Sequence, residues 1–153
     1  MKTGIIVYSQ TGHTKQAGQM LLDTLRDKGQ DGELLEIKVS NPQPEMNVSR
    51  VQLTSKPTVD AYDRLVFASP VWDFSLSGVM KAYLIRLPSL KGRKVHLFVT
   101  HQLPFSWLGG NNAIRQMKKL CEEKGGHVVS HAVINWGKKH RERDLGKMLE
   151  KLA

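Results

Sequence analysis

Short apolar runs alternate with amphipathic helical patterns along most of this sequence. The runs have the length of single strands and lie at residues 5–8, 34–39, 65–68, 95–99 and 128–134. Apolar residues at helical spacing follow four of them, over residues 15–28, 79–87, 113–121 and 144–152. Because each crossover helix must pack back on the sheet, this alternation gives parallel strands covered on both faces. The sequence therefore predicts an α/β fold, a three-layer sandwich around a five-stranded parallel sheet.

One segment interrupts the alternation. Residues 40–61 contain Asn41-Pro42-Gln43-Pro44 and Lys56-Pro57 and show no periodic pattern. We expect an irregular crossover there, in the place of a helix. The chain shows no internal repeat and no change of composition that would mark a domain boundary. With 153 residues and 40% hydrophobic content, it suits a single domain over residues 1–153.

The net charge of +9 is concentrated in the second half of the chain. Residues 1–76 hold 8 Lys and Arg against 9 Asp and Glu, which gives −1, whereas residues 77–153 hold 15 against 5, which gives +10. Such a field attracts acidic partners or phosphorylated cofactors. A solvated basic surface explains it better than a dedicated nucleic-acid site does.

Targeting signals and cysteine usage restrict the cellular setting. We find no apolar run long enough to span a bilayer and no charged-then-apolar signal region at the N-terminus, so we expect a cytoplasmic protein without a membrane contact. The single cysteine, Cys121, excludes an intrachain disulfide and a cysteine-based metal cluster. It is expected on the buried face of a helix.

The first strand-to-helix turn, Tyr8-Ser9-Gln10-Thr11-Gly12-His13-Thr14, suits a phosphate group. A strand that ends in such a turn and restarts as a helix directs backbone N–H groups and the positive end of the helix dipole at one spot. Hydroxyls of the Ser and Thr residues add donors without charge, and the glycine permits a tight turn. The turn alone fits a plain helix start, capped by Thr11 or Thr14, equally well.

Two further loops follow predicted strands. One contains Ser69-Pro70 and then residues 71–77, and the other covers residues 100–110. Ligands of parallel sheets bind outside the carboxyl ends of the strands, where these loops lie. Neither G-x-G-x-x-G nor G-x-x-x-x-G-K-[ST] occurs, and acidic residues do not end the first and third strands. These absences argue against a dinucleotide-binding Rossmann domain, a nucleotide hydrolase and a receiver domain.

The first two loops together resemble the flavodoxin family. In that family a Ser-x-Thr-Gly-x-Thr string forms the phosphate loop of a flavin mononucleotide (FMN) site, and residues 9–14 match it, with His13 where many members have Asn. The resemblance continues through Ser69-Pro70-Val71-Trp72, where members place an aromatic residue beside the isoalloxazine ring. The chain is similar to short-chain members, because it lacks a long insertion in the fifth strand. The resemblance implies a flavodoxin-like fold of strand order 2-1-3-4-5 with FMN as the cofactor.

The resemblance also implies which residues contact the cofactor. They come from three loops: Ser9, Gln10, Thr11, Gly12, His13 and Thr14; Pro70, Val71, Trp72, Asp73 and Phe74; and His101, Trp107 and Gly109. The first group would hold the phosphate, with added charge from Lys15. Trp72 would stack on or edge the flavin ring, unless it is a core residue.

Several of these roles stay open between alternative interpretations. Asp73 either accepts a hydrogen bond from a flavin N–H or caps the helix that follows. Trp107 or Phe105 forms the second wall of the flavin site, or packs beneath its loop, or makes a dimer contact. His101 either bonds the flavin or a substrate, or is a surface residue. The run from Lys138 to Arg141 is interpreted as a solvated basic patch.

The function implied by the resemblance is FMN-dependent electron transfer with an acidic redox partner protein. No catalytic acid, nucleophile or metal is needed, because the flavin performs the chemistry. The alternative is an FMN-dependent NAD(P)H:quinone-type oxidoreductase in which the third loop forms a substrate pocket. A flavin-free binding module is the third possibility. Both a monomer and a homodimer are compatible with the sequence.

Overall fold

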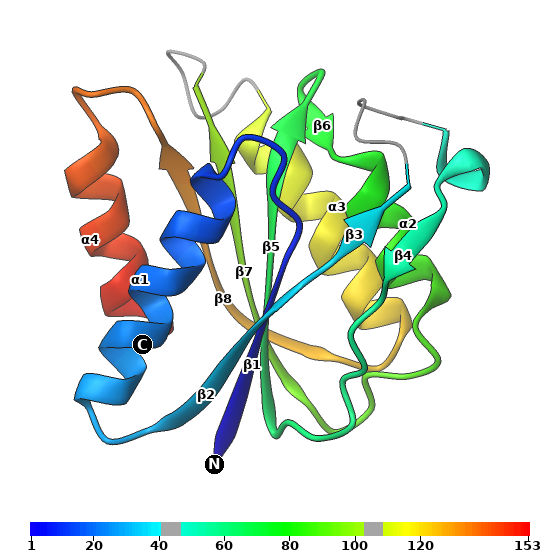
Figure 1. Cartoon of the computed structure of the whole chain (residues 1–153), viewed down its shortest axis with the longest axis horizontal. Helices are drawn as coiled ribbons and strands as arrows, with labels where there is room; N and C mark the ends of the chain where they lie inside the picture. The colour runs from blue at the N-terminus through cyan, green and yellow to red at the C-terminus, as the bar shows by residue number, and fades with distance from the viewer. Residues whose placement is uncertain (41–46, 103–108) are drawn as a thin grey trace.

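A parallel sheet forms the centre of the molecule (Figure 1). The computed structural model describes residues 1–40, 47–102 and 109–153. The strands run in the order β2, β1, β5, β7, β8, with bounds Asp31–Glu36, Lys2–Val7, Arg64–Trp72, Lys94–His101 and His127–Asn135. Counted along the chain this is 2-1-3-4-5, so the predicted fold class and strand order are confirmed.

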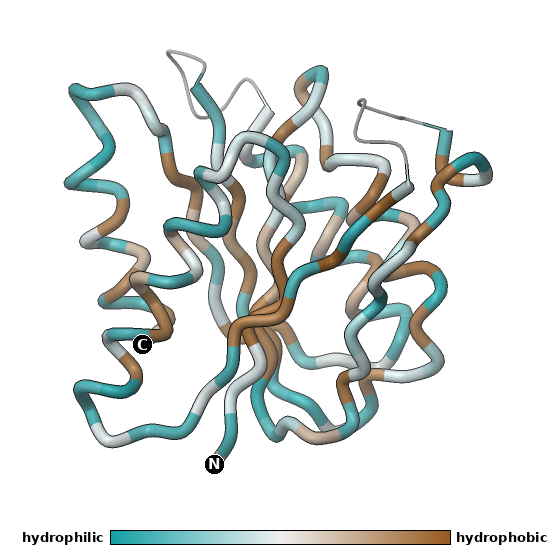
Figure 2. Tube along the Cα trace, in the orientation of Figure 1, coloured by the Kyte–Doolittle hydropathy of each residue, from teal (hydrophilic) through white to brown (hydrophobic). Residues whose placement is uncertain are grey.

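Helices cover both faces of the sheet, two on each. The helices α1 (His13–Asp27) and α4 (Arg141–Leu152) pack on one face, and α2 (Gly78–Arg86) and α3 (Gly110–Glu123) pack on the other. Apolar residues concentrate on the central strands, and the helix surfaces alternate between polar and apolar (Figure 2). The sheet thus divides the core into two layers, because its central strands β1, β5 and β7 are buried on both faces. None of the helices in the described part of the chain is long and apolar enough to cross a membrane.

The segment between β2 and β5 differs from the prediction. The second predicted strand is present with other bounds: β2 covers Asp31–Glu36 in place of residues 34–39, and β3 (Lys38–Val39) pairs antiparallel with β4 (Leu53–Ser55) in a separate small sheet. A short 3₁₀ helix, Val48–Arg50, precedes β4. The Arg86 guanidinium of α2 donates to the carbonyl oxygens of Val48 and Val51, at 3.0 and 2.9 Å. A helix far along the chain thus holds this segment in place, and local periodicity in the sequence of the segment could not predict its structure.

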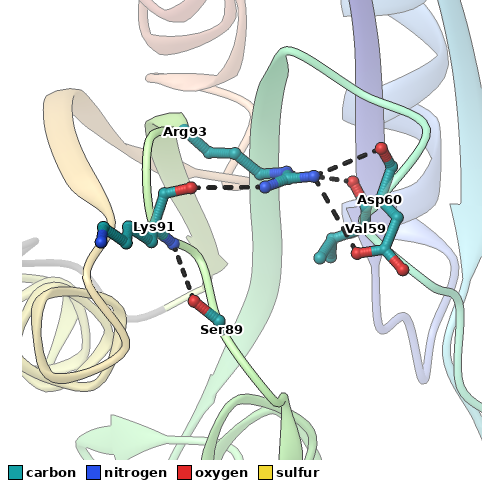
Figure 3. A network of polar contacts seen from close by, with 5 residues as sticks. All are labelled: Val59, Asp60, Ser89, Lys91 and Arg93. Carbon is teal, nitrogen blue, oxygen red and sulfur yellow. Dashed lines mark hydrogen bonds and ion pairs between the residues drawn. The ribbon is translucent and has the colours of Figure 1, made fainter.

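Arg93 joins two loops that precede the strands β5 and β7 (Figure 3). Its Nε donates to the carbonyl oxygen of Val59 at 3.2 Å, and Nη2 donates to that of Asp60 at 3.2 Å. Nη1 donates to the carbonyl oxygen of Lys91 at 3.4 Å. A single guanidinium therefore joins the loop before β5 to the loop before β7.

Replacing Arg93 with alanine is expected to lower the free energy of unfolding by about 1–3 kcal/mol, because the carbonyl groups of the two loops lose a charged donor. Chemical denaturation measures the change. Arg93→Lys keeps the charge but offers no planar fork, so it should recover only part of the loss. Full recovery by lysine would contradict the role given to the guanidinium geometry.

His96 makes stability depend on pH. It lies on β7, is only 7% exposed, and its Nδ1 is 2.6 Å from the Ser130 hydroxyl. Burial, with smaller effects of Arg64 and Lys94, lowers the pKa of His96 to about 4. Over this range the unfolded chain binds a proton at His96 that the folded chain does not bind, so stability is lost as the pH falls from about 6.5 towards 4.

We expect acidification over this window to remove up to about 3 kcal/mol of stability through His96. Denaturation curves of the wild type and His96→Gln at pH 7 and near pH 4.5 measure it. The variant should be less stable at neutral pH and lose less on acidification. An equal loss in both proteins would contradict the assignment.

Candidate functional site

A pocket of about 410 Å³ opens at the carboxyl ends of the central strands. Its walls come from three segments: the turn after β1, the end of β5 with the residues that follow, and the end of β7. The lining residues are Gln10, Thr11, His13, Pro70, Val71, Trp72, Asp73, Phe74, Thr100, His101 and Gln102. The loops that the sequence singled out therefore meet at one place in the part of the chain that the structure describes.

The turn between β1 and α1 is shaped by Ser9 and Gly12. Gly12 has φ 97°, in the left-handed region that favours glycine, and it stands immediately before α1 without a capping side chain. The Ser9 hydroxyl oxygen accepts from the backbone N–H groups of Gly12 and Lys15, at 3.1 and 3.2 Å. The capping role that the sequence offered to Thr11 or Thr14 thus belongs to Ser9.

The same turn leaves several main-chain donors available. Among the described residues, no hydrogen-bond acceptor meets the backbone N–H groups of Thr11, His13 and Thr14. These groups belong to the turn and the first residues of α1, where a helix has donors without internal partners. They lie at the positive end of the helix dipole, so the turn can bind an anion.

Two side chains of this turn are already engaged. The Thr14 hydroxyl is buried and lies 2.8 Å from the hydroxyl of Thr100 on β7. Lys15 Nζ lies 3.1 Å from Glu36 Oε2 at the end of β2. Lys15 therefore pairs with a carboxylate of β2, where the sequence analysis expected its charge at the phosphate, and the hydroxyl pair joins α1 to Thr100, which lines the pocket.

A hairpin forms the second wall. The end of β5 pairs antiparallel with β6 (Ser75–Leu76), joined by Asp73 and Phe74, whose φ angles of 47° and 59° lie in the left-handed region. A two-residue turn of this kind normally uses Asn and Gly, so an exposed Phe there carries backbone strain. The expected loop over residues 71–77 is thus an ordered hairpin that presents Phe74 at the pocket.

Helix α3 holds this hairpin in place. Asn112 donates from Nδ2 to the carbonyl oxygen of Phe74 at 3.0 Å, and Gln116 Oε1 accepts from the backbone N–H of Leu76 at 2.8 Å. Gly109 lies so close that a Cβ placed on it would be 2.7 Å from Phe74 Cα. Gly109 is therefore a packing residue behind the hairpin and does not line the pocket.

The geometry places Trp72 at the pocket and excludes Asp73 as the cap of α2. Trp72 is half-buried, lines the pocket, and meets the Tyr8 ring edge-on with centroids 5.6 Å apart. Ser77, and not Asp73, caps α2, since its hydroxyl accepts from the N–H of Met80 at 3.2 Å. Asp73 is exposed at the turn.

An aromatic stack supports the third side of the pocket. His13 stacks on the buried Trp136, with ring centroids 4.7 Å apart, and the Arg141 guanidinium lies 5.0 Å from the same tryptophan ring. Desolvation, reinforced by the charge of Arg141, lowers the pKa of His13. A neutral His13 therefore borders the turn between β1 and α1 at neutral pH. His101 is buried at the end of β7, so its interpretation as a surface residue is wrong.

Sequence reasoning missed three contributors to this site. Thr100 and Gln102 line the pocket, and Trp136 supports His13 from beyond β8. Trp136 was given no role from the sequence, and the structure shows it buried. Its position directly after an apolar run was the available signal. Phe105 and Trp107 lie outside the described residues.

Cys121 takes no part in the pocket. It is buried on α3 as predicted, and burial raises the pKa of its thiol to about 12. A thiol held in its protonated form is a poor nucleophile.

Comparison with known proteins gives a family and a fold. Residues 1–141 match the model of a family described as NADPH-dependent FMN reductase. A comparison of the sequence with curated proteins gives no match.

Solved structures share the fold at low sequence identity. A flavoprotein from Lactobacillus acidophilus, determined in complex with FMN, is 21% identical with a TM-score of 0.66, covering 86% of this chain and 92% of that one. Flavodoxin 1 from Bacillus cereus is 15% identical with a TM-score of 0.67, covering 98% and 93%. The two-electron reduced flavodoxin of Megasphaera elsdenii is 20% identical with a TM-score of 0.67, covering 97% and 98%. These likenesses support the flavodoxin-like architecture.

Proposed function

Because the chain belongs to the NADPH-dependent FMN reductase family, we propose that it binds FMN in the pocket at the ends of β1, β5 and β7 and catalyses its reduction by NADPH. The balanced reaction is NADPH + H⁺ + FMN → NADP⁺ + FMNH₂, in which a hydride and a proton reach the flavin. This proposal takes the reductase alternative of the sequence analysis in preference to the electron carrier.

The observation that carries the proposal is the set of free donors at the first turn. The backbone N–H groups of Thr11, His13 and Thr14 face no acceptor within the described chain, at the positive end of α1. Three such donors and a helix dipole match a phosphate monoester. In this assignment Gly12 keeps the turn tight, and Ser9 fixes its shape through the two N–H groups that it accepts.

Aromatic side chains suit the other end of the ligand. Trp72 and Phe74 line the pocket beyond the turn, and both are carried by the hairpin that Asn112 and Gln116 hold. A flat ring system buries well against such side chains. FMN, when bound, supplies the redox chemistry as acceptor of the hydride. The chain binds it, orients it and withholds water from one side.

His13 has a defined part in this proposal. Its ring is fixed between the pocket and Trp136, and its lowered pKa keeps it neutral at pH 7. A neutral imidazole next to the turn can donate or accept one hydrogen bond without adding charge. The phosphate is therefore bound mainly by main-chain donors.

Purified protein tests the proposal in two steps. Titration with FMN, followed by flavin fluorescence, should show binding at one site per chain. The loaded protein should then oxidise NADPH steadily in the presence of excess FMN, measured as loss of NADPH absorbance. FMN binding without NADPH oxidation would favour the electron carrier, and absence of FMN binding would favour the flavin-free module.

A further inference from the structure

A second hollow lies apart from the FMN pocket, between the outer edge of β8 and α4. Its volume is about 340 Å³. The strand contributes Ala132, Val133 and Asn135, and α4 with the residue before it contributes a stripe of charged side chains. β8 is the last strand of the sheet, and α4 lies beside it on the face of the sheet that also carries α1 (Figure 1). We call this hollow the edge groove.

The main chain of β8 directs alternate residues into this groove. Trp136 donates its N–H inward to the carbonyl oxygen of His101 at 2.7 Å, so Asn135, Val133 and His131 direct their main-chain groups outward. Two side chains confirm this alternation: the Asn135 N–H donates to Asp144 Oδ2 at 2.9 Å, and the His131 carbonyl oxygen accepts from Lys151 Nζ at 3.2 Å.

Between these two contacts the edge is open. The N–H and C=O of Val133 and the N–H of His131 have no hydrogen-bond partner among the described residues. An open strand edge is a template for another strand. The spacing of the free groups on alternate residues is that of a parallel or antiparallel ladder.

The helix beside this edge carries more basic than acidic side chains. Arg143, Lys147 and Lys151 follow one another at intervals of four residues, so they share one face of α4 and form its basic stripe, and Glu150 lines the groove with them. Asp144 on the same face is already used, since it accepts from the Asn135 N–H and lies 3.2 Å from Arg143 Nε. Three cationic side chains therefore stand against two carboxylates, Asp144 and Glu150, so the groove combines free main-chain groups with a net charge of +1.

We propose that the edge groove binds an extended acidic segment of a partner protein, which adds a strand to β8 and places its carboxylates against the basic stripe of α4. Strand addition supplies main-chain hydrogen bonds, and side chains of alternate residues supply specificity. In an extended segment every second side chain faces the same way, so acidic residues at alternate positions would all face α4.

Charge distinguishes this occupant from a second copy of the chain. A twofold pairing of two β8 edges would bring together two grooves of the same net charge, each with Arg143, Lys147 and Lys151 against Asp144 and Glu150. Like charges in that arrangement repel. The inference does not rest on the proposed FMN chemistry, because no residue of the edge groove lines the FMN pocket.

Synthetic peptides test the main-chain part of the proposal on the intact chain. A labelled peptide of alternating Glu and Val should bind, as measured by fluorescence anisotropy, and its Gln–Val counterpart should bind on the order of tenfold or more weakly. N-methylation of one alternating set of its amides should abolish binding, while methylation of the other set should be tolerated. Equal binding of both methylated peptides would overturn strand addition.

Charge reversal tests the location. Lys147→Glu in the edge groove should weaken the Glu–Val peptide on the order of tenfold or more. Lys119→Glu on the exposed face of α3 changes the net charge equally and should leave the peptide affinity unchanged. Equal weakening by both variants, or displacement of the peptide by a single-stranded oligonucleotide that binds more tightly, would overturn the proposal in favour of a general polyanion surface.

Discussion

Thr11→Glu is expected to weaken FMN binding on the order of 100-fold. The residue is exposed at the tip of the turn after β1, and its backbone N–H is one of the donors proposed to hold the phosphate. A carboxylate placed about 6 Å from a phosphate opposes it by about 3 kcal/mol at a surface-like dielectric constant. Fluorescence titration with FMN measures the loss.

Two controls separate charge from shape in this experiment. Thr11→Gln adds similar bulk without charge and should change FMN affinity by much less. Riboflavin has no phosphate, so Thr11→Glu should leave its affinity nearly unchanged. The substitution also places a negative charge near the positive end of α1, which does not destabilise the fold. If Thr11→Glu bound FMN as tightly as the wild type, the phosphate would have to lie elsewhere.

Gly109→Ala is expected to destabilise the protein and to disturb the FMN pocket at the same time. A Cβ at this position would lie 2.7 Å from Phe74 Cα and 3.0 Å from Val71 Cγ1. A backbone atom cannot move aside by rotating a side chain, so the hairpin that carries Trp72 must shift. Overpacking of this kind lowers the free energy of unfolding by about 1–3 kcal/mol. Thermal unfolding and FMN titration measure the two effects.

Gly146→Ala provides the matched comparison. Gly146 lies in α4, and a Cβ there would meet nothing within 4 Å. The same chemical change should therefore stabilise the protein, by up to about 1 kcal/mol, because alanine favours the helix. FMN affinity should not change. A Gly109→Ala variant as stable as the wild type would show that the hairpin can relax without strain.

The parallel sheet and its helices could be predicted because their signals are local. β-branched apolar runs such as Ile5 to Val7 must be buried on both faces, and helical spacing of residues such as Leu21 and Leu25 requires a covering helix. Both layers of the observed core contain these residues. The strand order came from the resemblance carried by residues 9–14 and 69–72, and the topology confirms it.

The structures of the segment between β2 and β5 and of the hairpin after β5 could not be predicted, because they depend on contacts with residues far along the chain. Arg86 holds the carbonyl groups of Val48 and Val51, and Gln116 holds Leu76. Each of these contacts joins segments more than thirty positions apart. The periodic pattern of a strand gives no information about such a distant partner.

For the candidate site, the sequence alone determined which three loops meet at one edge of the sheet, since parallel strands end on the same side. Tertiary structure decided what each side chain does there. Ser9 shapes the turn after β1, Thr14 pairs with Thr100 inside the protein, and Gly109 supports a hairpin. The physical reason is that a turn sequence fixes backbone geometry locally. The hydrogen-bond partner of a hydroxyl, and the room for a Cβ, depend instead on which element packs against the residue.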